Sequence, residues 1–462
     1  MGLTSILRGF AVMLFVISAA MLAPLALALI SGGNSGPYLF GAAAALIAGA
    51  GAYVASLGRP PPADFRGALV IILLWWMVVP VFAAAPFAMS GMSFADAYFE
   101  TVSAMTTTGG WLSNEGAIAT ADGALWRAEL QWLGGLGSLA IAAAIFIRPA
   151  FIGIDTLLPP FSRGASNSFL RPLRNAVISF ASVYAIMTML AFSTIALAGA
   201  PLLDSVIMAM STAASGGFIP DVDGIGAYPR PVALAMFPFI VLGGANFVLI
   251  ARIMRGMRER VRDVETGAYL LILVWVGVLF WLTAGAGNLL LLGPQIFNAA
   301  SLLSTNGYTI GEAPPLTVAM VTAIIGGAAV STAGGFKILR WLVIMRRARE
   351  ELRRLIIPRA VFGVRRVANE LGVWMHFIVF TMTLAILVVS LSIGGHHFDV
   401  AAAAATAALS NTGPLLYLAE GGGEGYAIFS EPLRWLLLIG MILGRLEAAV
   451  ALALFNRAFW RS

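Results

Sequence analysis

Four short stretches of the chain share a pattern that suits the binding of a dehydrated cation. In each, small residues, mostly with a hydroxyl or an amide, precede a glycine: Thr107-Thr108-Gly109, Ala214-Ser215-Gly216, Thr305-Asn306-Gly307 and Asn411-Thr412-Gly413. Such a cation needs a cage of oxygen atoms, and successive backbone carbonyls form one when they turn the same way. Glycine permits that turn because it has no Cβ. One such tripeptide is usually only a turn, but four copies predict a selectivity filter.

The spacing of these glycines predicts internal repeats. They stand 107, 91 and 106 residues apart, so each repeat has roughly a hundred residues. A polar residue precedes each glycine by 12 to 14 residues, where a short helix would start: Asp96, Asp204, Gln295 and Asp399. A carboxylate there is favourable as a cap and against the helix dipole. The partly negative C-terminal end of the same helix would then face the filter and stabilise a cation.

The composition places these stretches in a membrane. Of the 462 residues, 60% are hydrophobic and only 11% are charged, whereas soluble domains carry about 25% charged residues. Because a bilayer core needs about 20 apolar residues per helix, we predict ten spans, near 8–30, 38–57, 67–88, 124–147, 175–199, 229–251, 267–286, 316–345, 371–393 and 433–456. Four shorter apolar pieces, near 93–106, 201–214, 293–305 and 397–410, are too short to span and predict re-entrant segments.

The predicted fold is an all-α polytopic membrane protein. Two extra N-terminal transmembrane helices occupy residues 1–63, and four pseudo-repeats of helix, re-entrant pore loop and helix surround one pore: 64–150, 151–262, 263–350 and 351–462. The first apolar run follows Arg8 and resembles a signal peptide. Because it is long for a signal peptide and more spans follow, we interpret it as a transmembrane helix, and its cleavage stays open.

Charge orients this prediction. The net charge is +6, and Lys337 is the only lysine. Clusters of arginine fall in loops on one side, which the positive-inside rule makes cytoplasmic, together with the N-terminus. Acidic residues gather on the other side, around the four short segments. They either concentrate cations at an entrance or form a solvated acidic face. The sequence has no Cys, which excludes disulfides and cysteine nucleophiles.

Two features below the filter suggest a gate. Residues 325–336 are rich in Gly, Ala, Ser and Thr inside a long span, which breaks or loosens a helix or lets helices pack closely. Arg445 lies in the last span, where a charge is costly and usually functional. It could instead pair with Glu447 or reach the cytoplasm.

Several motifs carry a resemblance to a known family. They are Met105-Thr106-Thr107-Thr108-Gly109-Gly110, Ser215-Gly216-Gly217-Phe218, Ser304-Thr305-Asn306-Gly307-Tyr308, Ser410-Asn411-Thr412-Gly413-Pro414, Gln131-Trp132-Leu133-Gly134-Gly135, Gly326-Gly327 through Ser331-Thr332-Ala333-Gly334-Gly335-Phe336-Lys337, and Gly444-Arg445-Leu446-Glu447. Together they resemble the TrkH/KtrB family of bacterial potassium transporters over nearly the whole chain. The two spans before the first repeat favour the TrkH branch. The third filter motif, which ends in Gly-Tyr, departs from the family pattern.

The resemblance implies potassium uptake across the bacterial inner membrane, with K+ as the transported ion and no covalently bound cofactor. It implies K+ at the twelve residues of the four tripeptides. It also implies an intramembrane loop that blocks the closed pore with Arg445: Gly326, Gly327, Ser331, Thr332, Gly334, Gly335 and Lys337. As partners it implies membrane lipid, a second copy in a homodimer, and a cytoplasmic TrkA-type nucleotide-binding ring.

Other function classes fit less well. A Na+-permeable protein, or a cation- or proton-coupled secondary transporter of the same fold, remains the alternative. Secondary transporters also have broken helices, but usually in paired inverted halves. An enzyme is not expected, because the sequence shows no His, Asp or Glu cluster within a span and no phosphate-binding loop. Nothing in the basic residues requires nucleic acid.

Overall fold

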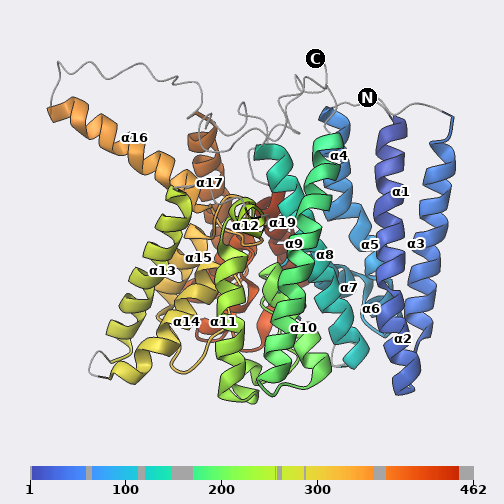
Figure 1. The fold of residues 1–462 in the computed structure, drawn as a ribbon, viewed down its shortest axis with the longest axis horizontal. Helices are drawn as coiled ribbons and strands as arrows, with labels where there is room; N and C mark the ends of the chain where they lie inside the picture. The colour runs from blue at the N-terminus through green and yellow to red at the C-terminus, as the bar shows by residue number, and fades with distance from the viewer. Residues whose placement is uncertain are drawn as a thin grey trace.

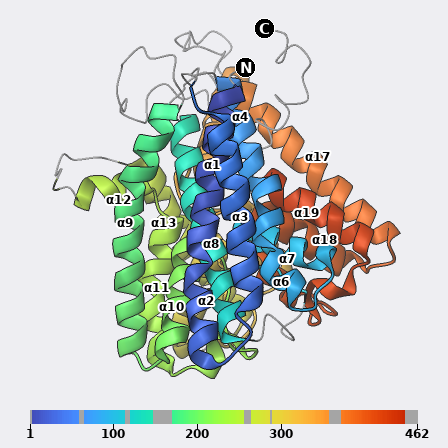
Figure 2. The ribbon, with the colours of Figure 1, turned by 90° about the vertical axis from the view of Figure 1, so that its right-hand side faces the viewer.

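The computed structural model describes residues 3–58, 65–112, 120–146, 170–254, 256, 263–285, 288–356 and 371–446. In this part of the chain the structure is helical and contains no strand (Figure 1). Two N-terminal hairpin arms come first, one made of α1 and α2 and the other of α3: α1 Leu3–Ala20, α2 Leu22–Ser31 and α3 Gly36–Ala55. They lie at the right-hand edge of the molecule in Figure 1 and face the viewer in Figure 2, against α4, α6 and α8.

The rest of the described chain repeats one order four times: a long helix, a short helix, a loop and another helix. The first repeat contains α4 Phe65–Leu73, the π-helical turn η1 Leu74–Val78, α5 Val79–Ala83, α6 Ala85–Met89, α7 Phe94–Met105 and α8 Ala121–Phe146. The second contains α9 Leu170–Leu197, α10 Leu202–Ala214, the 3₁₀ turn η4 Gly224–Ala227, α11 Arg230–Gly244 and α12 Phe247–Met254.

The third repeat contains α13 Val264–Thr283, the 3₁₀ turn η5 Leu289–Leu291, α14 Leu292–Leu303, α15 Leu316–Ile325 and α16 Ile338–Ile356. The fourth contains α17 Leu371–Ile393, α18 Phe398–Ser410, the 3₁₀ turns η7 Gly413–Leu418 and η8 Gly425–Ile428, and α19 Glu431–Leu446. Figure 1 shows α16 projecting away from the body.

The four short helices occur where the sequence predicts re-entrant segments. They are α7, α10, α14 and α18, and each has 12 or 13 residues, about 18–20 Å at 1.5 Å per residue, which is too short to cross a bilayer. Asp96, Asp204 and Asp399 stand in the first turns of three of them. In α7 the Ser93 hydroxyl also caps the start by accepting from the Asp96 amide at 3.1 Å.

The prediction of ten continuous spans is wrong in part. Six described helices are long and apolar enough to cross a membrane, or seven if the bent pair α11 and α12 is one span. The predicted span 229–251 bends by 109° between these two helices, and the predicted span 316–345 is interrupted between Ile325 and Ile338. The predicted span 124–147 is one helix, α8, but it carries Arg127 and Glu129. Part of the predicted span 433–456 lies outside the described residues.

Candidate functional site

Each short helix is followed, within two residues, by a residue with a left-handed backbone. Thr107, Ser215, Thr305 and Asn411 have φ values of 54°, 57°, 60° and 54°, which is uncommon for residues other than glycine. The amide of the next residue then turns back onto the helix and donates to the carbonyl five residues earlier. These bonds are 2.8 to 2.9 Å long: Thr108 to Ser103, Gly216 to Ser211, Asn306 to Ser301 and Thr412 to Ala407. The four loops therefore share the same turn at the end of the short helix.

This shared pattern corrects the register predicted for the second loop. Counting two residues from the left-handed residue gives Gly109, Gly217, Gly307 and Gly413, so the counterpart of Gly109 is Gly217 and not Gly216. Gly217 has a φ of 70°, as Gly109 does. The predicted triplet Ala214-Ser215-Gly216 is thus shifted by one residue. The error arises because a Gly-Gly pair fits either register in sequence, whereas only Gly217 has the left-handed backbone. We name residues 107–109, 215–217, 305–307 and 411–413 glycine loops 1 to 4.

The glycine loops touch one another in a closed ring. A Cβ added to Gly109 would lie 2.0 Å from the Gly216 carbonyl oxygen, and one added to Gly217 would lie 2.0 Å from that of Asn306. At Gly307 the neighbour is Pro414, which follows loop 4, at 3.0 Å, and at Gly413 it is the Gly110 amide, at 2.3 Å. Each glycine therefore abuts the next loop in order, and no larger residue fits where the backbones approach.

Hydrogen bonds also cross the ring. The Gly413 amide donates to the Thr108 carbonyl at 2.5 Å, and the Asn411 amide group donates to the Thr108 hydroxyl at 3.0 Å. The Gln131 side chain, from α8, donates to the Gly216 carbonyl at 2.8 Å. All twelve predicted filter residues are buried. The structure thus brings the four predicted tripeptides together at one place.

The interrupted span in the third repeat forms a loop directly beneath this ring. We name residues 326–337, between α15 and α16, the inner loop. Its two ends meet, because the amides of Phe336 and Lys337 donate to the carbonyls of Ile324 and Ile325 at 2.8 and 3.0 Å. Gly326, with a φ of 70°, makes this close return possible. The predicted break in the helix is therefore present.

The inner loop is bonded to three glycine loops or their helices. The Gly334 amide donates to the Thr305 hydroxyl at 2.8 Å, and the Gly335 amide donates to the Ser410 carbonyl at 3.1 Å. The hydroxyls of Ser215 and Thr332 share a hydrogen bond of 2.9 Å. The inner loop therefore lies on the same axis as the ring.

Arg445 connects α19, the inner loop and glycine loop 1. Its buried guanidinium donates from Nε to the Thr106 carbonyl at 2.5 Å and from Nη1 to the Thr332 carbonyl at 2.9 Å. Nη2 donates to the Thr107 hydroxyl. Lys337 turns back onto its own loop, where Nζ donates to the Ala333 carbonyl. The alternative partner for Arg445, Glu447, lies outside the described residues.

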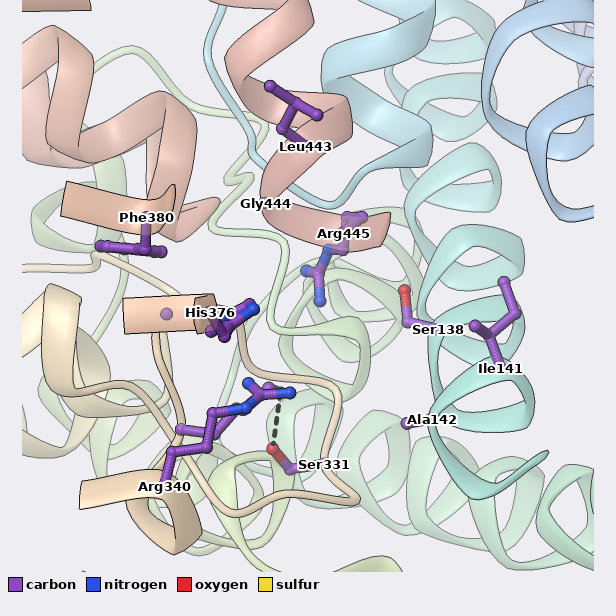
Figure 3. Close-up of a pocket in the computed structure, with 13 residues that line it drawn as sticks. Ser138, Ile141, Ala142, Ser331, Arg340, His376, Phe380, Leu443, Gly444 and Arg445 are labelled. Atoms are coloured by element: carbon purple, nitrogen blue, oxygen red, sulfur yellow. Dashed lines mark hydrogen bonds between the residues drawn. The ribbon is translucent and has the colours of Figure 1, made fainter. Parts of the chain in front are cut away.

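A small cavity of about 30 Å³ lies beside these contacts, large enough for one or two waters. Figure 3 shows that Arg445, Arg340, His376 and Ser138 reach it from α19, α16, α17 and α8. The predicted gate residues Ser331, Gly334, Gly335 and Lys337 complete part of its lining. The cavity is thus a basic space on the far side of the inner loop from the ring.

Sequence reasoning missed a carboxylate that holds the inner loop. Glu265, in the first turn of α13, is buried and accepts from the Ala329 amide at 2.6 Å and from the Asn246 side chain at 3.2 Å. Asn246 stands at the bend between α11 and α12, and its side-chain oxygen accepts from the Val248 amide at 3.0 Å. A charge and an amide at the edges of apolar spans are the signals that could have identified these residues.

Acidic residues at the starts of the short helices have partners. Asp96 forms an ion pair with Arg434 at 2.7 Å, and Asp204 accepts from the Tyr228 hydroxyl at 2.9 Å. Burial, and then this hydrogen bond, raise the pKa of Tyr228, so the phenol stays a neutral donor. These contacts favour a structural role for the two carboxylates over a free ring of negative charge.

Comparisons with known proteins agree with this geometry. Residues 39–282 and 294–460 match the family model described as TrkH, cation transport protein. The chain is 32% identical to the Trk system potassium uptake protein TrkI of Halomonas elongata, over 99% of this chain and 96% of that one. It is 27% identical to TrkH of Escherichia coli K12, over 86% of each chain.

A solved structure has the same fold. The crystal structure of the potassium transporter TrkH from Vibrio parahaemolyticus covers 100% of both chains with a TM-score of 0.85 and 26% identity. The predicted all-α polytopic membrane fold is therefore confirmed. With the family model matching most of its length, the chain belongs to the TrkH family of cation transport proteins.

Proposed function

We propose that this chain takes up K+ across the bacterial inner membrane through the ring of four glycine loops, which acts as its selectivity filter. The closure of that ring carries the proposal, since four segments separated by about a hundred residues meet through glycine contacts. The named relatives are potassium uptake proteins, which supports K+ as the ion. The residues of glycine loops 1 to 4 would hold it, with Gly217 in place of Ala214 in loop 2.

The inner loop is proposed as the gate. It occupies the axis beneath the ring, and Arg445 adds a buried positive charge there. Two charges about 4 Å apart interact by roughly 4 kcal/mol at an effective dielectric constant of 20, so a cation would meet a high barrier. Opening would move the inner loop, and Gly326, Gly327, Ser331, Thr332, Gly334, Gly335 and Lys337 are the residues that we assign to it.

The partners follow from the same family assignment. We propose a homodimer with one pore in each protomer, embedded in lipid with the N-terminus in the cytoplasm. A TrkA-type nucleotide-binding ring would bind the cytoplasmic face and control the inner loop. We further propose that the four repeats span 64–150, 151–262, 263–350 and 351–462, after an N-terminal unit of residues 1–63.

The membrane potential alone would be sufficient to drive uptake. A monovalent cation gains about 2.3 kcal/mol per 100 mV, so about 150 mV supplies roughly 3.5 kcal/mol, or a few-hundred-fold accumulation. The test is K+, Rb+, Na+ and Li+ flux into liposomes under an imposed potential, without a Na+ or proton gradient. Protein with Arg445→Ala is measured in parallel, so that a closed gate does not hide conduction.

We expect K+ and Rb+ to enter faster than Na+ and Li+ in at least the Arg445→Ala protein. Liposomes without protein give the background. Flux that appears only when a Na+ or proton gradient is imposed would replace this proposal with a coupled secondary transporter. Equal rates for all four ions would instead support the alternative, a Na+-permeable protein of the same fold.

A further inference from the structure

A fully buried ion pair lies behind glycine loop 1. Glu100 of α7 and Arg127 of α8 meet at 2.6 Å, and neither side chain has any exposed surface. Removing two ions from water costs several kcal/mol per ion, and apolar residues of similar volume are often at least as stabilising. Stability alone therefore does not account for this pair, and its contacts point to another role.

Both members of the pair contact the chain where it leaves the ring. Glu100 Oε1 accepts from the Leu112 amide at 2.7 Å. The Arg127 guanidinium lies 4.3 Å from the ring centre of Trp111 and 4.9 Å from that of Phe218. Trp111 follows loop 1 by two residues, and Phe218 follows loop 2 directly. One guanidinium thus spans the exits of two neighbouring loops.

The contact continues to loop 4. The Trp111 carbonyl accepts from the Tyr426 amide at 2.9 Å, and the Tyr426 hydroxyl donates to the Gly413 carbonyl at 3.2 Å. The Trp111 and Phe218 rings also pack edge to face, with centroids 4.8 Å apart. A shift of Trp111 would therefore reach three of the four loops.

The third repeat shows which part of this arrangement needs a charge. Asn298 occupies the place in α14 that Glu100 occupies in α7, three residues before the serine that accepts the loop amide. Its side-chain oxygen accepts from the Ile310 amide at 2.8 Å, twelve residues on, just as Glu100 accepts from Leu112. A neutral amide is thus enough to tie a short helix to its loop exit, so the charge of Glu100 serves Arg127.

Arg127 itself is held by few polar contacts. Its Nε and Nη1 make no hydrogen bond within the described part of the chain, so Glu100 and the two aromatic faces fix its position. A planar guanidinium stacks on such faces, whereas the compact ammonium of lysine does not. The group therefore acts as a flat spacer between the exits of loops 1 and 2, and Glu100 neutralises it.

We propose that Arg127, neutralised by Glu100, is a positioning residue that fixes the spacing of glycine loops 1 and 2 and so sets the discrimination between K+ and Na+. The proposal rests on the filter role proposed above. Na+ is smaller than K+, so a filter that selects by fit must resist closing its oxygen atoms around the smaller ion. A spacer that the ion never touches can supply that resistance.

The test is the ratio of K+ to Na+ flux in liposomes, measured in the Arg445→Ala background. Arg127→Lys keeps the charge but removes the stacking plane, and we expect the ratio to fall by about tenfold while K+ flux persists. The matched control is Arg434→Lys. Arg434 also pairs with an acid of α7, Asp96, at 2.7 Å, but away from the ring. The K+/Na+ flux ratio of the Arg434→Lys protein should therefore stay unchanged.

A second variant tests the proposal if the Arg127→Lys protein does not fold. Glu100→Gln combined with Arg127→Met removes both charges at similar volume and should also lower the ratio in protein that elutes as a single species. An unchanged ratio in folded Arg127→Lys or in this double variant, while Gly217→Ser lowers it, overturns the spacer and leaves the filter standing. If Gly217→Ser also leaves the ratio unchanged, the filter assignment fails, and the spacer with it.

Discussion

The ring of glycine loops and the inner loop lie next to each other but are built in different ways. Every repeat contributes one loop to the ring. Each loop has a left-handed residue at the equivalent position and the equivalent backbone hydrogen bond. The inner loop occurs once, in the third repeat, where the first repeat has the continuous helix α8. It is held by side chains from outside the loop, among them Arg445 of the fourth repeat and Glu265 at the start of the third. The fourfold repeat is thus kept in the ring, where ions would be selected. Beneath the ring, at the inner loop, the repeat is not kept.

This difference suggests that selectivity and flow are separable. Contacts between backbones in the ring leave no room for a Cβ, so a substitution there must displace a neighbouring loop. A side-chain hydrogen bond to a charged group, by contrast, contributes only about 1.5–3 kcal/mol, so removing one disturbs the ring less than a Cβ placed between its backbones. Changes in the ring should therefore alter the ion ratio, and changes at the inner loop should alter the rate.

The largest effect is expected at Arg445. Arg445→Ala removes the charge beneath the ring and the bonds to the inner loop, together with the bonds to Thr106 and Thr107. If only about 2 kcal/mol of the roughly 4 kcal/mol repulsion acts on the ion, K+ flux should rise about 30-fold. Liposome flux without any cytoplasmic partner measures it, and Arg445→Lys, which keeps the charge, should stay near the native rate. Unchanged or lower flux in folded Arg445→Ala would show that the arginine is structural.

The next effect concerns the ring and its register. Gly217→Ala should lower the K+/Na+ ratio by about tenfold or more, because a left-handed backbone disfavours a Cβ and the added Cβ would strike the Asn306 carbonyl. The atoms nearest to a Cβ added at Gly216 all belong to the Gln131 side chain, the closest at 2.4 Å. Adding Gln131→Ala should therefore restore most of the K+/Na+ ratio in the Gly216→Ala protein. It should not restore the ratio in the Gly217→Ala protein.

Rescue of both glycine variants by Gln131→Ala, or of neither, would contradict this register. The measurement is the same ion ratio in liposomes, with total K+ flux followed to exclude simple loss of folded protein. Gln131→Ala alone serves as the control. This control measures the effect of losing the hydrogen bond from Gln131 to the Gly216 carbonyl, which both double variants also lose.

The sequence predicts the residues of the ring better than the residues that hold the inner loop beneath it. The predicted segments 93–106 and 201–214 match α7 and α10 to within one residue at most ends, since a short apolar run between turn residues is a local signal. The Gly216-Gly217 register is not local, because it depends on which glycine meets loop 3. Likewise the bend at Asn246 and the partners of Glu265 arise from contacts between segments far apart in the sequence, which one sequence does not reveal.

A smaller effect is expected at Glu265, which holds the inner loop at Ala329, whereas Arg445 holds it at Thr332. Glu265→Gln keeps the size and one acceptor oxygen but replaces a charged hydrogen bond to Ala329 with a neutral one, a loss of ~1 kcal/mol. K+ flux should then rise about fivefold at an unchanged K+/Na+ ratio. Asp263→Asn is the matched control at the start of the same helix, because asparagine also caps a helix start and the Asp263 side chain bonds only to Glu265 and Thr266 among the described residues.

Combining Glu265→Gln with Arg445→Ala tests whether the two side chains hold one element. Sites far apart with no shared partner have additive effects, whereas sites that act on one element do not. If both release the same inner loop, the double variant should conduct little more than Arg445→Ala alone, because an open loop cannot be opened again. Two independent barriers would instead multiply the rates fivefold further, and the inner loop would then not be the single gate. A changed ion ratio in either single variant would show that the inner loop and the ring are not separable.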